Sequence, residues 1–391
     1  MRGGWPANNI FNKMAPMETG VLTCTVRASQ LTDFVNEALL ATGSTPDQAQ
    51  AVTRALVSAT LRGVDSHGVR LLPHYLRVLA GGRIAPDPQL RVTRTAASAA
   101  TVDADNGFGH YASYRAVSEG SAIAKETGIA GVSVINSSHF AAAGCYALEA
   151  AEQGLVAFAF CNTDAYVLLH DGVSPFHGTN PIAFAAPVVG ERPYLVDMAT
   201  SVVPWNRVRD YEAKGLSLPE DVAVDARGQM SSDPKTVAAL LPFGGTTYGF
   251  KGAALAGIVE VLSASLTGMA HCSRLLPMAG EDISTPRRLG HFFLVIDPAA
   301  FVPRSVFDVG MAAYLSDLRA RASKPGTTTM APGDREWESL DKRNEHGVPL
   351  APALVTDFRA IAARLGLDAA FLDEHLELNN RARCTSLGSE T

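Results

Sequence analysis

The middle of the chain alternates short β-branched segments with longer Ala-rich segments, and this alternation most constrains the fold. Residues 101–103 precede an Ala-rich stretch that runs through Lys125, and residues 131–135 precede another over residues 141–153. Residues 156–161 form a further strand-like run. Strands that alternate with segments of helical length indicate helices packed on a sheet. The sequence therefore predicts an α/β fold.

Helical patterns flank this middle region. Residues 29–79 are helical in pattern, and Thr45-Pro46-Asp47-Gln48 provides an N-cap, a first-turn proline and a capping-box glutamine. Further strands are expected at residues 182–187, 194–197 and 291–296, an apolar helix at 252–266, and amphipathic helices at 306–321 and 352–365. The order along the chain is helices, then strands with helices, then helices again.

Composition excludes several classes of protein. With 391 residues, 47% of them hydrophobic, the chain can bury a large core, and its net charge of −6 argues against a nucleic-acid-binding protein. Residues 1–20 lack the apolar core of a signal peptide and are expected to be a disordered extension. No apolar run approaches the length of about 18 residues that a membrane span needs, so no membrane partner is expected.

The cysteines and histidines show no pattern typical of metal binding. Five cysteines are scattered without a C-x-x-C pair, which indicates neither a disulfide framework nor a zinc site and fits a reducing cytoplasm. His170, His177, His271 and His291 share no ligand-like spacing, so no metal is expected.

The segment Gly107-Phe108-Gly109-His110-Tyr111-Ala112 matches the dinucleotide fingerprint G-x-G-x-x-A. A Rossmann site also needs an acidic residue at the end of the next strand, to bind the ribose. Here that strand is followed by Asn136-Ser137-Ser138-His139, which has no carboxylate. The segment is therefore interpreted as a tight turn that begins a helix.

Residues 65–75 carry a hydroxyl, an imidazole, a guanidinium and a phenol just past an apolar helix that ends near Leu61. This set can bind a small anion and move a proton. Ser66 and His67 are neighbours, so on a helix their side chains would point apart, and a nucleophile pair for hydrolysis is disfavoured.

Several loops at strand and helix ends could hold an anion or a ligand. His139 stands in the loop between a strand and a helix, where free backbone N–H groups favour an anion; the alternative is that Ser138 only caps that helix. Lys251 is expected at the start of the apolar helix, where a cation is better explained by a phosphate or carboxylate ligand. The other candidate loops are Gly178-Thr179-Asn180-Pro181, Asp197-Met198-Ala199-Thr200-Ser201 and Gly333-Asp334-Arg335-Glu336.

Seven motifs follow one another in an order that points to one known family. They are Arg62-Gly63-Val64-Asp65-Ser66-His67-Gly68, Asn136-Ser137-Ser138-His139-Phe140, Gly178-Thr179-Asn180-Pro181-Ile182-Ala183, Val196-Asp197-Met198-Ala199-Thr200, Lys251-Gly252, Gly290-His291-Phe292-Phe293 and Pro332-Gly333-Asp334-Arg335-Glu336. Through them the chain resembles, over residues 31–367, the malate and L-lactate dehydrogenase family that lacks a Rossmann fold.

The resemblance implies an oxidoreductase that uses NAD or NADP to interconvert a small 2-hydroxy acid and its 2-oxo acid. It also implies a non-Rossmann dinucleotide-binding sheet domain and a largely helical domain built from both chain ends, assembled as a homodimer. On this sequence the α/β NAD(P)-binding domain would span residues 91–304. The helical substrate and dimer domain would combine residues 21–90 and 305–391.

Carried over by position, the resemblance makes His67 or His139 the proton donor and acceptor, with Ser66 supporting His67. Tyr75 and Thr163 would touch the substrate. Arg70 and Asn180 are further candidates for substrate binding. The cofactor would contact Ser138, Val196, Asp197, Met198, Ala199, Thr200, Ser201, Phe250, Lys251, Gly333, Arg335 and Glu336.

One position departs from the family pattern. Relatives usually carry Arg five residues after the motif Ser, whereas here that position is Leu71 and Arg70 precedes it. A guanidinium can hold a substrate carboxylate through two hydrogen bonds, so this change bears on the substrate class. Two alternatives to the 2-hydroxy acid dehydrogenase stay open: a reductase of a cyclic imino acid such as piperideine-2-carboxylate, and a non-catalytic homologue that binds a dinucleotide.

Overall fold

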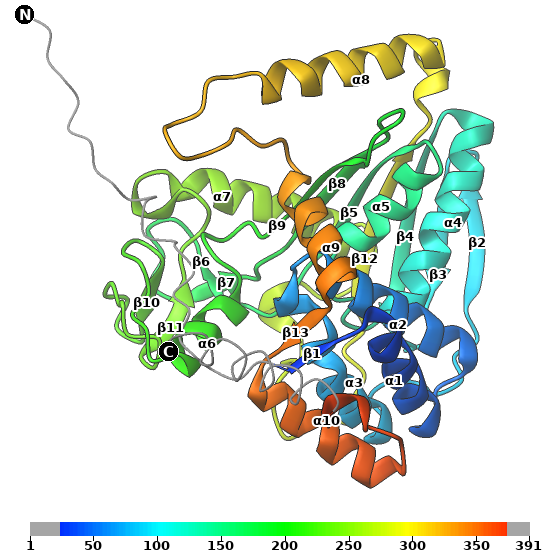
Figure 1. Cartoon of the computed structure of the whole chain (residues 1–391). Coiled ribbons are helices and arrows are strands. Elements are labelled where there is room, and N and C mark those ends of the chain that lie inside the picture. The colour runs from blue at the N-terminus through cyan, green and yellow to red at the C-terminus, as the bar shows by residue number, and fades with distance from the viewer. Residues whose placement is uncertain (1–23, 374–391) are drawn as a thin grey trace, which may run out of the picture.

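The centre of the molecule is a mixed sheet of seven strands, in the order β2-β3-β4-β12-β5-β8-β9 (Figure 1). The computed structural model describes residues 24–373, so the extension expected at residues 1–20 lies outside the described residues. The strands of this sheet are β2 (Arg91–Ala96), β3 (Ala99–Asp103), β4 (Ile129–Ser137), β5 (Val156–Cys161), β8 (Ile182–Ala186), β9 (Tyr194–Met198) and β12 (Leu289–Ile296).

The pairing of these strands confirms an α/β fold and excludes a Rossmann sheet. Only β3 and β4 are parallel neighbours in this sheet, and the other pairs, including β12 with both β4 and β5, are antiparallel. A doubly wound dinucleotide fold is built from parallel strands. Strand β2 was not predicted from the sequence, because five of its six residues are exposed and it carries no apolar alternation.

Helices cover the sheet and also form a separate cluster. They are α1 (Ala28–Ala41), α2 (Pro46–Leu61), α3 (Leu72–Ala80), α4 (Gly109–Thr127), α5 (Gly144–Glu152), α6 (Trp205–Ala213), α7 (Gly245–Glu260), α8 (Arg304–Arg319), α9 (Asp334–His346) and α10 (Pro352–Leu365). The main core lies between α4, α5 and the sheet and includes many alanines, which allow the helices to approach the strands closely. A π-helical turn, Val261–Ser265, continues α7 and contacts β12.

A second hydrophobic core joins the two ends of the chain. Strand β1 (Cys24–Val26) pairs with β13 (Val348–Leu350), and Phe34 of α1 packs on Phe358 of α10 with ring centroids 5.0 Å apart. Helices α2 and α3 complete this core. Helix α8 instead packs against Val188 and Tyr194 near the sheet. The division of the chain at residues 90/91 and 304/305 stays a prediction.

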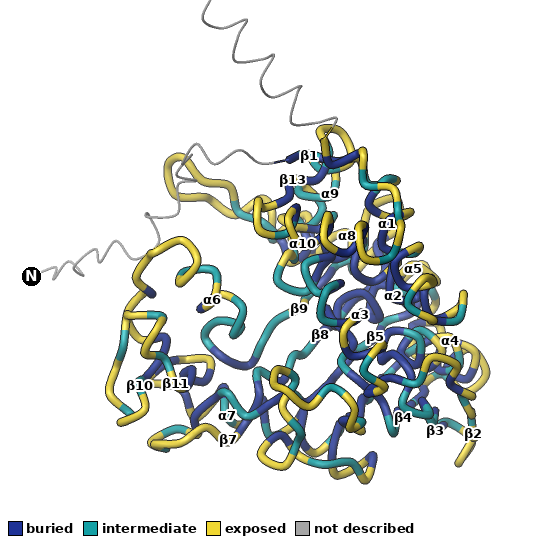
Figure 2. The backbone as a smooth tube through the Cα atoms, turned by 90° about the horizontal axis from the view of Figure 1, so that it is seen from below, coloured by how far each residue is buried: buried dark blue, intermediate teal, exposed yellow. Residues whose placement is uncertain are grey.

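A small four-stranded sheet with α6 beside it was not predicted from the sequence. Its order is β10-β11-β6-β7, with β6 (Val167–Leu168), β7 (Pro175–His177), β10 (Ala223–Asp225) and β11 (Val237–Leu240). Strands of two to four residues are too short to show a period in the sequence. Figure 2 shows exposed residues in the loops around β10 and α6, whereas the residues of the central strands and α2 are mostly buried or half-buried.

Gln48, expected to close a capping box, has a different role. Helix α2 does start at Pro46 after the N-cap Thr45, but Gln48 donates to the carbonyls of Ala85 and Pro86 at 3.1 and 2.9 Å. Its carbonyl accepts from Phe108 N at 2.8 Å. Gln48 is fully buried, so it ties α2 to the turn before α4.

No helix within residues 24–373 is long and apolar enough to cross a membrane.

The glycines at 107 and 109 are explained by packing. A Cβ on Gly109 would overlap the carbonyl oxygen of Ser138, and one on Gly107 would lie 2.6 Å from the Pro88 ring. The Ser138 hydroxyl accepts from Gly109 N at 2.9 Å and donates to Gly107 O at 3.0 Å. This turn therefore fastens the start of α4 to the end of β4.

We expect Gly109→Ala to destabilise the protein, because the Ser138 backbone cannot move without shifting the end of β4. Overpacking of this kind costs about 1–3 kcal/mol. Gly310→Ala is the matched control: Gly310 lies in α8 with open space around it, and alanine in a helix is favoured over glycine by roughly 1 kcal/mol. Chemical denaturation of both variants measures the difference, and equal stabilities would contradict the packing argument.

Candidate active site

Several of the predicted site residues gather at one edge of the central sheet. Strand β12 runs antiparallel between β4 and β5, with Leu289 opposite Ser137 and His291 opposite Cys161. The ends of β4 and β5 and the start of β12 therefore meet. Ile182 at the start of β8 pairs with Phe160 and with Met198 at the end of β9, which brings two more strand ends to the same edge. The residues two positions beyond these strand ends are His139, Thr163, Asn180, Thr200 and Arg287.

His67 and His139 face each other across this edge. Their ring centroids lie 6.1 Å apart and the ring planes differ by 26°. His139 follows β4, whereas His67 ends a 3₁₀ turn, Asp65–His67, after α2. The structure thus brings together the two histidines that the sequence left as rivals for the proton-transfer role.

Ser66 lies against the ring of its neighbour, contrary to the expectation that the two side chains point apart. The Ser66 Oγ and the His67 Nδ1 are 2.9 Å apart. The expectation assumed α-helical geometry, but these residues form a 3₁₀ turn that the hydroxyl can span. Ser66 therefore engages Nδ1 of His67, an arrangement that fixes the orientation of the ring.

Tyr75 plays the matching part for His139. Its hydroxyl lies 2.6 Å from the His139 Nδ1, and its side chain is fully buried. The edges of His110 and Phe108 surround the phenol, with ring centroids 4.8 and 5.8 Å from that of Tyr75. Among the described residues, the Nε2 atoms of His67 and His139 have no hydrogen-bond partner, which leaves them for a substrate.

Residues around the 3₁₀ turn hold it in place. Arg343 of α9 donates from Nη2 to the Asp65 carboxylate at 2.9 Å. The backbone N–H of Val69 donates to Thr60 Oγ1 at 2.9 Å, and a Cβ on Gly68 would overlap that same oxygen. The turn is therefore anchored to α2 and to α9 on either side of His67.

Both histidines are neutral at pH 7. Burial, and then the charge of Arg70, lowers the pKa of His67 to about 4. Burial also lowers the pKa of His139 well below its usual value, with smaller contributions from His67 and Arg287. A neutral imidazole can accept a proton from a substrate hydroxyl.

The side chain of Asn180 is part of a buried hydrogen-bond network. It is fully buried, and its amide nitrogen donates to Glu260 Oε1 at 2.8 Å and to the Ala256 carbonyl at 3.2 Å. Its side-chain oxygen accepts from Thr163 N at 3.1 Å. Asn162 donates to the other Glu260 oxygen at 3.3 Å. This network positions Thr163, and the predicted substrate contact of Asn180 stays a prediction.

The side chain of Thr163 is half-buried at the sheet edge. Its hydroxyl accepts from Thr179 N at 2.9 Å. Arg70 lies in a second 3₁₀ turn, Val69–Leu71, and Leu71 packs against the helical core instead of facing the histidines. The predicted substrate contacts of Thr163 and Arg70 stay predictions.

Most of the predicted cofactor residues adjoin one another. Gly333, in the left-handed region with φ +100°, begins α9 next to Leu195 of β9, so the expected loop at 333–336 is a helix start. Asp197 accepts from Gly144 N, at the start of α5, at 2.8 Å. Thr200 O accepts from Phe243 N at 2.8 Å, and Phe243 O accepts from Gly252 N at 3.1 Å. Val196, Met198, Ala199, Ser201, Phe250, Arg335 and Glu336 belong to these same segments.

Ser138 differs from the capping alternative, and Lys251 stands where it was expected. The Ser138 hydroxyl is buried and bonded to the turn before α4, so it does not cap α5, and its predicted cofactor contact stays a prediction. Helix α7 has a kink at Tyr248, and Lys251 lies in the first turn of the regular helix that follows, with its Nζ 5.1 Å from the Tyr248 ring centroid.

The donor set of these segments fits a dinucleotide. Lys251 and Arg335 are exposed cations, and the N-terminus of α9 presents backbone N–H groups, both suited to phosphates. The exposed carboxylate of Asp197 and that of Glu336 could bind ribose hydroxyls. Within residues 24–373 no group of three or more His, Cys, Asp or Glu side chains is placed to hold a metal ion.

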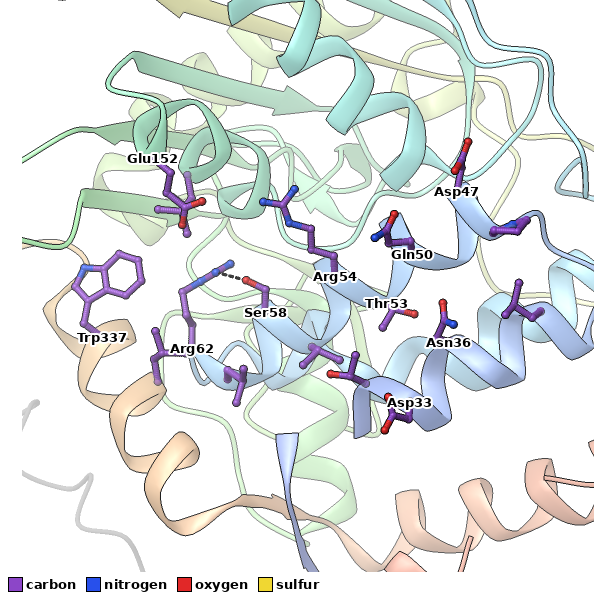
Figure 3. A pocket seen from close by; sticks show the side chains of 17 residues that line it. Asp33, Asn36, Asp47, Gln50, Thr53, Arg54, Ser58, Arg62, Glu152 and Trp337 are labelled. Carbon is purple, nitrogen blue, oxygen red and sulfur yellow. Dashed lines mark hydrogen bonds between the residues drawn. The ribbon is translucent and has the colours of Figure 1, made fainter. Parts of the chain in front are cut away.

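A groove on the described surface lies away from these residues. It has a volume of about 790 Å³ and runs between α1, α2, α5 and α9, lined by Asp33, Arg54, Arg62, Glu152 and Trp337 among others (Figure 3). Arg62 is held in it by Ser58 and by the Cys145 thiol. None of the predicted site residues lines this groove, so the histidine edge is identified by its chemistry and not by its depth.

The sequence matches the family described as malate/L-lactate dehydrogenase over residues 26–359. It is 33% identical over 350 residues to a malate dehydrogenase of Pyrococcus horikoshii, covering 88% of this chain and 96% of that one. It is 37% identical over 311 residues to a Δ1-pyrroline-2-carboxylate/Δ1-piperideine-2-carboxylate reductase of Pseudomonas putida, covering 76% and 86%. The crystal structure of a malate dehydrogenase from Entamoeba histolytica superposes with a TM-score of 0.84 at 28% identity, covering 89% and 99%.

We expect His110→Phe to make stability less sensitive to acid. Burial lowers the pKa of His110 to about 3, and neither ring nitrogen has a partner among the described residues. The unfolded chain therefore binds one more proton than the folded chain below the ordinary pKa of about 6.5, so His110 lowers stability as the pH falls from 6.5 toward 3. Above that window it has no effect.

Phenylalanine keeps the ring against Tyr75 but cannot titrate. Between pH 7 and pH 5 the free energy of unfolding of the variant should fall by about 2 kcal/mol less than that of the parent. Denaturant titrations at the two pH values provide the comparison. A variant with the parent's pH dependence would show that His110 is already protonated in the folded protein.

Proposed function

Because the chain belongs to the malate/L-lactate dehydrogenase family, we propose that it interconverts a small 2-hydroxy acid and its 2-oxo acid with NAD or NADP. The observation that supports this most is the facing pair of His67 and His139. Each ring is engaged at Nδ1 by a hydroxyl, from Ser66 or Tyr75, and each has Nε2 available. This is the equipment for moving one proton at a substrate oxygen.

The nicotinamide, when bound, supplies or accepts the hydride at C2 of the substrate. In the oxidation direction one neutral histidine takes the hydroxyl proton on Nε2. In the reduction direction the same nitrogen returns the proton to the developing alkoxide. A substrate carboxylate close to the ring raises the pKa of the histidine, because an opposite charge favours the imidazolium. The bound acid thereby helps to create its own proton donor.

A second candidate is reduction of a cyclic imino acid, which the 37% identity to the Pseudomonas putida reductase favours. The same histidine pair would then protonate the ring nitrogen in place of an oxygen. The carboxylate and the hydride acceptor carbon are common to both substrate classes, so the same site geometry serves both.

We expect His67→Asn and His139→Asn each to lower kcat, one of them by about a hundredfold or more, as for removal of a general acid or base. The assay is absorbance of NADH or NADPH with oxaloacetate, pyruvate and Δ1-piperideine-2-carboxylate. His346→Asn, which replaces an exposed histidine at the end of α9, is the matched control and should keep parental turnover. Near-parental turnover in both active-site variants would refute the histidine mechanism, and no turnover by the parent with either cofactor would refute the proposed function.

We also propose that the protein is a homodimer in the cytoplasm. Large apolar side chains are exposed along α7, its π-helical turn and α8, including Val261 at 59% and Val309 at 70%. Apolar surface of this extent is typical of an interface. Cys24, Cys145, Cys161 and Cys272 are free and buried, which suits a reducing compartment.

Light scattering should give a mass near twice the 41.2 kDa of one chain. Val261→Asp places a charge on the exposed turn and should shift the mass toward that of one chain, because burying an unpaired carboxylate is costly. Glu345→Gln, at an exposed position of α9 outside α7 and α8, serves as the control. A parent that scatters as a single chain would rule the dimer out.

A further inference from the structure

Two arginines near the facing histidines differ in how firmly they are held. Arg287, just before β12, is 4% exposed and paired with Asp164, which is 10% exposed. Arg287 also donates from Nε to the Leu276 carbonyl at 2.7 Å, and Asp164 accepts from Met278 N at 2.7 Å. Removing one partner of a buried pair is strongly destabilising. Arg287 is therefore committed to the fold.

Arg70 is held loosely. Its Nη1 lies 3.6 Å from Asp210 Oδ1, and the two side chains are 34% and 39% exposed. Exposed ion pairs of this length contribute little stability. Arg70 is close enough to His67 for its charge to lower the pKa of that ring. Among the described residues Arg70 has no partner besides Asp210.

Asp210 can leave Arg70 without losing all its partners. The Lys214 Nζ, one helical turn further along α6, lies 3.5 Å from the other carboxylate oxygen of Asp210. When Arg70 is released, the Asp210 carboxylate therefore loses one of its two cationic partners and stays paired with Lys214.

Helix α6 approaches the two 3₁₀ turns, at Ser66 and at Arg70, through polar contacts. Asn206, four residues before Asp210 and so on the same face, donates to the Ser66 carbonyl at 2.8 Å. The apolar residues of α6 pack elsewhere: Val208 belongs to the core of the small sheet, and Trp205 stacks on Tyr166 with centroids 4.5 Å apart. The face of α6 that meets the turn can therefore separate from it without exposing a hydrophobic core.

We propose that Asp210 competes with the substrate carboxylate for Arg70, so that α6 sets the affinity for anionic substrates. The inference rests on the proposed function and names two residues, Arg70 and Asp210, that determine substrate binding. A substrate carboxylate is the same chemical group as the Asp210 side chain, and two carboxylates at one guanidinium repel each other. Arg70 lies three residues after His67, in the next 3₁₀ turn, and its charge acts on the His67 ring, so a substrate held at Arg70 would lie near that imidazole.

The competition is tested by a double-mutant cycle at Arg70 and Asp210. Asp210→Asn should lower the KM for the 2-oxo acid by roughly two- to fivefold with kcat unchanged, the range expected for loss of one exposed ion pair. Arg70→Gln should raise KM by roughly tenfold or more, as for loss of a charged hydrogen bond to the substrate. In the double variant the gain from Asp210→Asn should vanish, because Arg70 is no longer there to be released.

The matched control is Asp308→Asn, since Asp308 also pairs with an arginine, Arg304, on an exposed helix away from the site. It should leave both KM and kcat at parental values. An unchanged KM in Asp210→Asn, or a gain that persists in the Arg70→Gln background, would overturn the inference.

Calorimetric binding of oxamate in the presence of NADH separates this inference from the proposed function. Oxamate carries the carboxylate of a 2-oxo acid but is not reduced, so its binding reports on Arg70 without turnover. Tighter oxamate binding by Asp210→Asn in a protein that turns over none of the test substrates would support the competition and refute the dehydrogenase. Turnover by the parent with unchanged oxamate binding in Asp210→Asn would support the dehydrogenase and refute the competition. A parent that neither turns over the test substrates nor binds oxamate would refute both the dehydrogenase and the competition.

Discussion

The position of β12 between β4 and β5 is the constraint on which the rest of the structure depends. Because β12 is antiparallel to both neighbours, its start meets their ends at one edge of the sheet. The start of β8 and the end of β9 lie at the same edge. A parallel sheet would bring only carboxyl ends to that edge. This arrangement lets residues from five separate loops converge, among them His139, Thr163 and Arg287. The helical cluster then needs to supply only one turn, with His67, to complete the pair.

Two buried polar side chains, Ser138 and Gln48, connect the sheet to the helices by hydrogen bonds. Ser138 fastens the start of α4 to the end of β4, and Gln48 fastens α2 to the same turn through Phe108. Tyr75 lies against Phe108 and His110 and holds His139. The position of His139 opposite His67 is therefore fixed by buried hydrogen bonds and aromatic contacts around one turn. A displacement of that turn would move Tyr75 and with it the His139 ring.

The sequence predicted those parts of the fold whose signal is local. Strand β5 and helix α10 have the predicted bounds, because a β-branched or amphipathic run of sufficient length carries its own period. The sequence singled out both histidines as candidates and the family resemblance gave them the proton-transfer role, but their convergence could not be derived from their spacing. Asn206 and Asp210 were missed because they lie about 140 residues after the turn that they contact, on a short polar helix. Glu260 was missed since an acidic residue in an apolar helix gives no hint of two buried asparagines around it.

The shift of arginine from position 71 to position 70 has a physical explanation in this packing. Leu71 is partly buried against the core formed by both chain ends, where a guanidinium would lie against apolar side chains. The Arg70 side chain lies next to Asp210 of α6, where its guanidinium stays partly exposed to solvent and pairs with that carboxylate. A site with two neutral histidines cannot attract an acid by their charge, so its attraction for a carboxylate depends on such a nearby cation. Since Arg287 is neutralised by Asp164, we assign the electrostatic preference of the site for an anion to Arg70, whose exposed partner Asp210 can be displaced.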